Sequence, residues 1–276
     1  MKIKQTDKPK DIALKVIYDY CEKMGVEITE AFEKYHLLKK YYSASKEDRP
    51  KYRDEIWLEK HWYDSLKSGT PDYGVYADPY YFTDMINCFN LYSRNYVLMM
   101  NKVGRLMSES ILDMVPFGGT LIDMGCGIGL ASMLLKDIRP DLEIYATNIE
   151  DTDQWRYMVA NAEDMGAINL ISEQYPEYPQ ADIIFASEYF EHILNADEHL
   201  VELIEKAKPK MLVCANAFNA RSTGHFDEYI YEGKKVANKE MPKLFKKRMI
   251  QLGYEQVKTG FFNNRPQLFI KKNGSN

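Results

Sequence analysis

The chain has few features of a secreted or membrane-spanning protein. Only four of its 276 residues are cysteines, and they form no C-x-x-C pair, which argues against a zinc ribbon or a disulfide framework. No apolar run approaches the roughly 18 residues that a membrane-spanning helix needs. The basic N-terminal residues precede no apolar segment, so we expect no signal peptide and a cytoplasmic location.

Positive charge is not in excess either. The formal net charge is −5, which gives no global attraction to nucleic acid. Basic side chains do cluster at residues 234–248. Such a run is usually the solvated face of a helix, and contact with a phosphate-bearing substrate or RNA is the alternative. The chain contains no repeat, and its length suits one large domain with an appendage or two modest domains.

The pattern of apolar residues changes near residue 116. Residues 1–115 show helical spacing and hold 13 of the 21 tyrosines, which predicts a helical cap whose aromatic side chains pack its core or line a ligand pocket. Residues 116–276 alternate strands and helices, which predicts a mostly parallel sheet covered by helices on both faces. Strands are expected at Thr120–Asp123, Leu142–Asn148, Ile168–Ser172, Asp182–Ser187, Lys210–Asn216, Tyr254–Phe261 and Gln267–Lys271, and helices notably at Gln154–Met165 and His199–Ala207.

The most informative segment is Leu121-Ile-Asp-Met-Gly-Cys-Gly-Ile-Gly-Leu130. An apolar strand ends near Asp123, glycines follow at 125, 127 and 129, and a helical run begins. A glycine-rich turn between a strand and a helix is where doubly wound α/β domains bind adenosine-type ligands. The spacing D-x-G-x-G-x-G differs from the dinucleotide fingerprint G-x-G-x-x-G, which disfavours an NAD-linked dehydrogenase.

This segment resembles the first motif of class I S-adenosylmethionine-dependent methyltransferases, and the closing strand pair is also similar to their fold. The resemblance implies an α/β Rossmann-like sheet with a mainly helical N-terminal cap. It implies cofactor contacts by the glycine loop, by Asn148 or Glu150 where the family has a ribose-binding acid, and by residues near the adenine and the methyl group. The cofactor-binding residues implied are Asp123, Gly125, Cys126, Gly127, Gly129, Asn148, Glu150, Ser172, Glu173 and Ser187.

The segment after the fourth predicted strand, Glu188-Tyr-Phe-Glu-His-Ile193, carries acidic and imidazole groups. On a helix, Glu188, Glu191 and His192 would share one face. Carboxylates with imidazole suit Mg, Mn, Fe or Zn, and His225 follows the fifth predicted strand. The sequence therefore predicts a candidate divalent-metal site at Glu188, Glu191, His192 and His225.

The same pattern resembles the metal site of the ubiquinone-pathway O-methyltransferases and the small-RNA terminal 2′-O-methyltransferases. A metal on two adjacent hydroxyls would lower the pKa of one of them. Alternatively, His192 or His225 is a general base, with Glu188 a further catalytic candidate. In the metal-free alternative, the acid and imidazole groups contact cofactor or brace the helix.

These observations favour a methyltransferase acting on a hydroxyl of a small or sugar-like acceptor, with S-adenosyl-L-methionine as cofactor. Metal-free N- or O-methylation and RNA terminal 2′-O-methylation are alternatives, as is a non-catalytic binding module that keeps the fold. Asp78-Pro-Tyr-Tyr81 lacks the second proline of the amino-methylating D-P-P-Y motif, so a turn that opens a helix is expected there. A small-molecule partner is favoured over nucleic acid, and the oligomeric state is left open.

Overall fold

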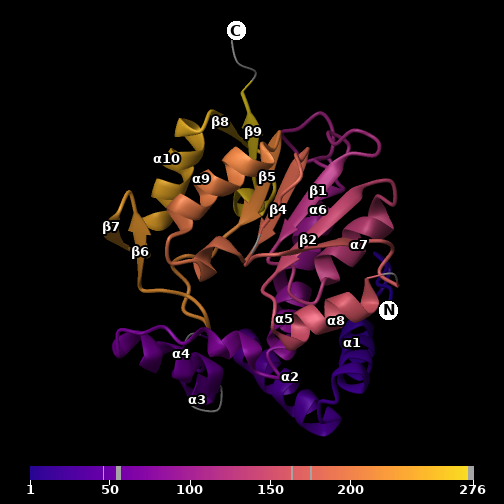
Figure 1. Ribbon diagram of the computed structural model, residues 1–276, viewed down its shortest axis with the longest axis vertical. Helices are drawn as coiled ribbons and strands as arrows, with labels where there is room; N and C mark the ends of the chain where they lie inside the picture. Colours follow the sequence, from indigo (N-terminus) through magenta and orange to yellow (C-terminus); the bar gives the residue numbers. More distant parts are fainter. Residues whose placement is uncertain (46, 54–56, 163, 175, 273–276) are drawn as a thin grey trace.

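The computed structural model describes residues 1–45, 47–53, 57–162, 164–174 and 176–272 (Figure 1). In this part of the chain, a seven-stranded sheet has the order β3-β2-β1-β4-β5-β9-β8. The first five strands in sequence are parallel, β9 is antiparallel to β5, and β8 is antiparallel to β9. The strands are β1 (Thr120–Met124), β2 (Glu143–Asn148), β3 (Asn169–Ser172), β4 (Ile183–Ser187), β5 (Met211–Ala215), β8 (Tyr254–Val257) and β9 (Gln267–Lys271).

The predicted fold class is confirmed. Each predicted strand is present, although the run expected to reach Phe261 ends at Val257. Two helices differ from their predicted bounds: one spans Asp153–Asn161, with Glu163 of its predicted range outside the described residues, and the other begins earlier, at Ala196. The helices of this half are α7 (Leu130–Ile138), α8 (Asp153–Asn161), α9 (Ala196–Ala207) and α10 (Met241–Gln251).

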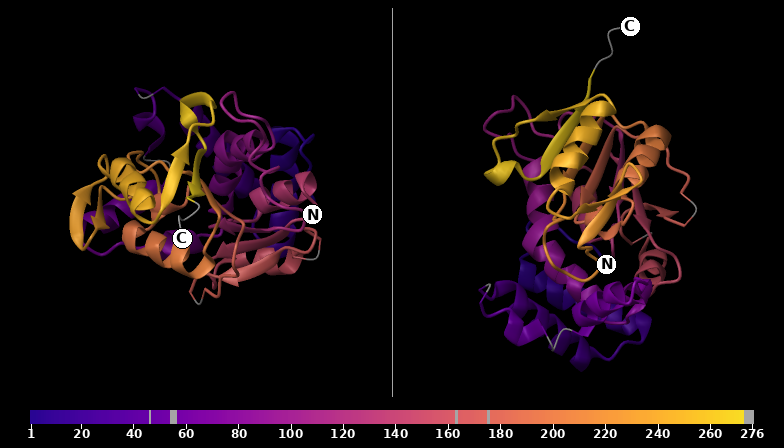
Figure 2. Two further views of the ribbon diagram at one scale, coloured as in Figure 1. Left: turned by 90° about the horizontal axis from the view of Figure 1, so that it is seen from above. Right: turned by 90° about the vertical axis from the view of Figure 1, so that its left-hand side faces the viewer.

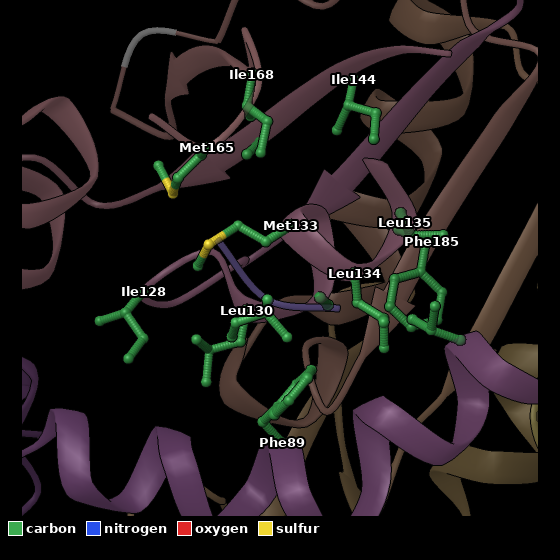
Figure 3. Close-up of a cluster of buried hydrophobic side chains, with 14 of the residues drawn as sticks. Phe89, Ile128, Leu130, Met133, Leu134, Leu135, Ile144, Met165, Ile168 and Phe185 are labelled. Atoms are coloured by element: carbon green, nitrogen blue, oxygen red, sulfur yellow. The ribbon is translucent and has the colours of Figure 1, made fainter. Parts of the chain in front are cut away.

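The sheet is buried on both faces because successive side chains of a strand point to opposite sides. On β4, Ile183 and Phe185 belong to one hydrophobic core, while Ile184 and Ala186 belong to another. Figure 3 shows part of the first core, where Phe185 lies among side chains of α7 such as Leu134. Each fully buried aliphatic or aromatic side chain contributes about 1.5–3 kcal/mol, so these two layers hold the strands in register.

The N-terminal residues form a helical cap at one end of the sheet, drawn in indigo and purple (Figures 1 and 2). Its helices α1 and α5 share the first core with α7 and β2. The prediction of a helical cap is therefore confirmed, and packing joins it to the sheet domain. Its elements are α1 (Pro9–Met24), α2 (Ile28–Ser43), α3 (Pro50–Arg53), α4 (Trp57–Lys67), the 3₁₀ turn η1 (Tyr73–Ala77), α5 (Phe82–Cys88), the π-helical turn η2 (Phe89–Ser93) and α6 (Arg94–Met100).

Asp78 forms the expected turn before α5, since Asp78 Oδ1 accepts a hydrogen bond from the Tyr80 amide at 2.8 Å. No described helix has the length and apolar content needed to cross a bilayer.

The basic run at 234–248 is not a single solvated helix face. Its first residues form β7 (Lys234–Ala237), which pairs with β6 (Glu228–Tyr231) in a separate hairpin. The rest belongs to α10, where Arg248 points inward and contacts both carboxylate oxygens of Asp197 at 2.6 and 2.9 Å. Asp197 also accepts from the Glu232 amide at 3.2 Å. Arg248 is therefore a structural residue that ties α10 to α9 and to the hairpin.

Candidate functional site

A cavity of about 460 Å³ lies between the helical cap and the carboxyl ends of the parallel strands, which is the binding position of doubly wound folds. The cap is held there by Ser93 of η2, whose hydroxyl is 2.9 Å from the hydroxyl of Ser187 at the end of β4. The cavity is within the size range of small-molecule sites. Its lining includes Tyr41, Tyr42, Arg49, Tyr73, Tyr76, Tyr81, Asp84, Tyr92, Asp123, Gly125, Cys126, Gly127, Asn148, Glu173, Ser187, Glu188, His192, Arg221, His225 and Arg265.

The glycine loop forms one wall of this cavity. Gly125, Gly127 and Gly129 all have positive φ angles, of 60°, 59° and 79°, a region that glycine enters without steric cost. Gly125 is exposed and Gly127 half-buried, so backbone of the loop faces the cavity. A Cβ atom at Gly125 would lie 2.4 Å from Tyr189 Cδ2, and one at Gly129 would lie 2.5 Å from Met158 Sδ. Gly129 therefore permits close packing of α7 and does not line the cavity.

Asp123 lies beneath the glycine loop and is almost fully buried. Ser132 of α7 donates a hydrogen bond to Asp123 Oδ2 at 2.5 Å. Burial raises the pKa of the Asp123 carboxyl to about 7, although the bond from Ser132 opposes this shift. The carboxyl can therefore gain or lose a proton near neutral pH, in response to what enters the cavity.

Of the residues predicted to contact the ribose and the adenine, some line the cavity and others do not. Asn148 lines the cavity, but its side-chain amide donates to the Gly127 carbonyl at 2.7 Å and its oxygen accepts from the Ile149 amide at 2.8 Å. Asn148 thus braces the glycine loop. Glu150 and Ser172 are absent from the described lining of the cavity, and the Ser172 hydroxyl accepts from the Gln174 amide at 3.3 Å.

Glu173, which is half-buried, is the centre of a hydrogen-bond network under the glycine loop. Its Oε1 accepts from the Thr147 hydroxyl at 2.5 Å and from the Gly125 amide at 3.2 Å. Its Oε2 accepts a hydrogen bond from Tyr189 Oη at 3.0 Å. The same Tyr189 hydroxyl oxygen lies 2.8 Å from His199 Nε2. Burial raises the pKa of Glu173. His199 of α9 is thereby connected to the loop.

The segment after β4 does not form the predicted helix. Glu188 has a left-handed conformation, with φ of 51°, and its amide donates to the Ala215 carbonyl at 2.9 Å. Only residues 190–192 form a short 3₁₀ helix. The expectation that Glu188, Glu191 and His192 share one helical face is therefore wrong, because the chain reverses its direction at Glu188 before the turn begins.

Glu188, which is half-buried, and Glu191, which is fully buried, form an acid pair. Glu191 Oε1 accepts from the Ala217 amide at 2.7 Å, and its other oxygen is buried with no donor among the described residues. Burial, and then the adjacent Glu191 carboxyl, raise the pKa of Glu188 well above its usual range. Glu188 therefore favours its protonated form more strongly than an ordinary carboxyl does.

His192 and His225 meet on the opposite side of the cavity. Their rings are in edge-to-face contact, with centroids 4.7 Å apart. Tyr76 Oη lies 3.0 Å from His192 Nδ1. Burial, and then His225, lower the pKa of His192 well below its usual range, so His192 is neutral at physiological pH.

The tautomer of His225 follows from its partner. His225 Nδ1 lies 2.9 Å from the Ala220 carbonyl oxygen, which can only accept a hydrogen bond. Nδ1 therefore carries the hydrogen, and Nε2 of the neutral ring has a free electron pair. The indole of Trp62, which is fully buried, donates to the His225 backbone carbonyl at 2.6 Å. The cap thus fixes the position of a group that can accept a proton.

The four predicted metal ligands lie in two pairs, Glu188 with Glu191 and His192 with His225. Across the described ranges, no three His, Cys, Asp or Glu side chains are grouped so that they could hold a metal ion. Glu191 is engaged by a backbone amide and His225 Nδ1 by a backbone carbonyl. The divalent-metal site therefore stays a prediction, and the arrangement of these residues as an acid pair and a histidine pair also suits proton transfer.

Several cavity residues were not predicted from the sequence, among them Tyr76, Arg49 and Arg221. Gly224 was also missed. A Cβ atom at this position would overlap Tyr76 Oη and His192 Nδ1, so only glycine allows the loop to approach the histidine pair. The sequence does place Gly224 directly before His225. This pair could not indicate a close contact, because the contact involves Tyr76 and His192, which are distant in sequence.

Comparison with known proteins gives structural neighbours only. No protein-family model matches the chain, and no curated protein matches its sequence. A protein of Nostoc punctiforme described as an O-methyltransferase is 12% identical over 77% of this chain and 68% of its own, with a TM-score of 0.47. An O-methyltransferase family 2 protein of Planctomyces limnophilus, in complex with apigenin, is 13% identical over 72% of this chain and 61% of its own, with a TM-score of 0.45.

A methyltransferase of Pyrococcus furiosus is 16% identical over 58% of this chain and 79% of its own, with a TM-score of 0.39. The fold itself follows from the strand order, in which parallel strands 3-2-1-4-5 are extended by an antiparallel pair, and from the glycine loop after β1. The protein has a class I methyltransferase fold of the Rossmann-like type.

Proposed function

We propose that this protein is an S-adenosylmethionine-dependent methyltransferase that methylates a hydroxyl group of a small acceptor without a metal. One observation carries the proposal: a single cavity is lined both by the exposed glycine loop and by the His192–His225 pair. The first is a cradle for an adenosine-type ligand, and the second is a proton acceptor. Methyl transfer to a hydroxyl requires both.

The residues present fit this cofactor. Gly125 and Gly127 leave backbone open toward the cavity, and a side chain at Gly127 would lie 2.9 Å from Met85 Sδ of the cap. Asp123, whose pKa burial raises to about 7, can ionise beside the amino group of the cofactor's methionine portion. When bound, S-adenosylmethionine supplies an activated methyl group.

The chain supplies positioning and a base. His225 Nε2 accepts the proton of the acceptor hydroxyl, and the Ala220 carbonyl stabilises the resulting imidazolium through Nδ1. The tyrosine walls of the cavity, which include Tyr73, Tyr76 and Tyr81, exclude water and orient a ring-shaped acceptor. Much of the rate enhancement in such a site comes from alignment of the two reacting groups.

Thermal unfolding with S-adenosylhomocysteine tests the proposal. Ligand that binds only the folded state raises the unfolding temperature, and we expect a rise for the native chain that is absent in Gly127→Val. Gly118→Val is the matched control, since Gly118 also has a positive φ, of 70°, but has open space around it. Transfer of labelled methyl groups to a panel of phenols and catechols completes the test. No thermal response in the native chain would favour a binding module without catalytic activity.

A further inference from the structure

Three arginines line the cavity: Arg265, whose guanidinium donates to the Asn216 carbonyl at 3.3 Å, and two others that stack on tyrosine rings. Arg49 follows α2, and Arg221 lies in the loop after β5. Each guanidinium lies over a tyrosine ring: Arg49 Cζ is 5.6 Å from the ring centroid of Tyr41, and Arg221 Cζ is 3.9 Å from that of Tyr63. Stacking on an aromatic face holds a guanidinium in a fixed orientation while its N–H groups remain able to donate.

A buried carboxylate connects these two stacks. Glu59 is 2% exposed. Its Oε1 is 3.3 Å from Arg221 Nε, and its Oε2 accepts from Tyr41 Oη at 2.8 Å. Arg49, which lies over the same Tyr41 ring, has a buried Nε with no hydrogen-bond partner within the described part of the chain. Among the side chains that the structure describes here, two guanidinium groups therefore lie beside the Glu59–Tyr41 pair.

The other acids that line the cavity do not balance this charge. Asp84 accepts from Tyr42 Oη at 2.6 Å, and burial raises its pKa. Burial also raises the pKa of Glu173 and of Glu188. Each of these acids favours its neutral form more than an ordinary carboxyl does, so each opposes the positive charge of the arginines less than an ionised carboxylate would.

The arginine cluster and the candidate base are connected by one loop. Arg221 directly follows Ala220, whose carbonyl oxygen holds His225 Nδ1. Consecutive Cα atoms are about 3.8 Å apart, so the Arg221 backbone is fixed relative to the imidazole. The tyrosine walls, which include Tyr73, Tyr76 and Tyr81, lie along the same cavity.

We propose that Arg49 and Arg221 form an anion subsite, and that the acceptor is an aromatic hydroxy acid whose carboxylate binds these guanidinium groups. A guanidinium matches the planar geometry of a carboxylate, and the ring of such an acceptor would pack on the tyrosines. This inference rests on the proposed function, because it names the substrate class of that same site. It assigns specificity to Arg49 and Arg221 and proton transfer to His225.

Binding of a matched pair of ligands tests this subsite. Caffeate and methyl caffeate share the same catechol ring, but only caffeate carries a carboxylate. Their affinities would be measured by calorimetry on protein saturated with S-adenosylhomocysteine. Because a hydrogen bond to a charged group contributes about 1.5–3 kcal/mol, the native chain should bind caffeate about tenfold or more tightly than its ester. Arg49→Gln and Arg221→Gln should each reduce this preference to about threefold or less, with Arg221→Lys intermediate.

Arg156→Gln is the control, since Arg156 lies on α8 in an exposed ion pair with Asp153 and should leave the preference unchanged. The unfolding temperature of Arg49→Gln and Arg221→Gln, measured with S-adenosylhomocysteine, shows whether each variant is folded. Equal affinity of the native chain for acid and ester, or failure to bind either, would overturn the anion subsite. Loss of the S-adenosylhomocysteine response itself would instead overturn the proposed function.

Discussion

Gly224 lies so close to His192 that a Cβ atom on the glycine would overlap the imidazole Nδ1. The backbone of the loop after β5 is thus fitted against the turn after β4, and this contact sets the distance between His192 and His225. The site therefore depends on a close approach of two loops, in addition to the side chains that line it.

Gly224→Ala should separate these loops. We expect a loss of about 100-fold in methyl-transfer rate, since small displacements of reacting groups have effects of that order. The unfolding temperature shift with S-adenosylhomocysteine should persist. Gly233→Ala is the control: Gly233 also has a positive φ, of 73°, but nothing lies within 4 Å of its Cβ position. Equal loss of activity in both variants would show that backbone strain, and not the overlap with His192, is responsible.

His225→Asn should remove the proposed base and keep its structural contact. The asparagine amide can still donate to the Ala220 carbonyl, whereas the Nε2 electron pair is lost. The turnover number should fall by about 10²–10⁴, the usual range for loss of a general base. His36→Asn, at an exposed position on α2, should have no effect. Turnover retained within about threefold of native would remove His225 from the mechanism.

Asp123→Asn should change how stability depends on pH. Burial raises the folded-state pKa of Asp123 to about 7, whereas the unfolded value is about 3.9. The folded state then binds more protons, so this group stabilises the protein below about pH 4 and its contribution is lost as pH rises through about 7. In the native chain, this titration should lower the free energy of unfolding by on the order of 2–4 kcal/mol as pH rises from about 4 to 7. Asp123→Asn should not show this decrease.

Denaturant unfolding of both chains between pH 4 and pH 7 would measure this difference. Asp141→Asn provides a contrast of opposite sign, because the bond from Arg139 lowers the pKa of Asp141. Its stabilising contribution is present above about pH 4 and is lost as pH falls. Parallel curves for the native chain and Asp123→Asn would contradict the assignment of Asp123 as a carboxyl that titrates near neutral pH.

Arg248→Ala should destabilise the protein without altering the cavity. The Arg248 and Asp197 side chains are 18% and 8% exposed, so removal of the guanidinium leaves a buried carboxylate with only the Glu232 amide. We expect a loss of about 2–3 kcal/mol in the free energy of unfolding, measured with urea. Lys246→Ala, at an exposed position of the same helix, should change it by less than about 0.5 kcal/mol. Similar values for both variants would restore the interpretation of 234–248 as a solvated surface.

The local features of the fold were predictable from the sequence. The strand that ends near Asp123, the three glycines and the helix that follows are adjacent in the chain, so their pattern reports directly on their structure. The same holds for the apolar runs that became the parallel strands. The proposed cofactor loop could be predicted from local sequence alone, because the conformation of a glycine is a property of a few consecutive residues.

The assembly of the site was decided by tertiary structure. Trp62 contacts His225, and Ser93 contacts Ser187, across long separations in sequence, and no periodic pattern encodes such pairs. Glu188 left its expected helix because a reversal after β4 allows its amide to pair with β5. Arg248 turned inward because Asp197 was buried beside it. The sequence by itself thus determined a glycine loop between strand and helix, whereas docking of the cap determined which side chains share its cavity, because that choice depends on packing between distant segments.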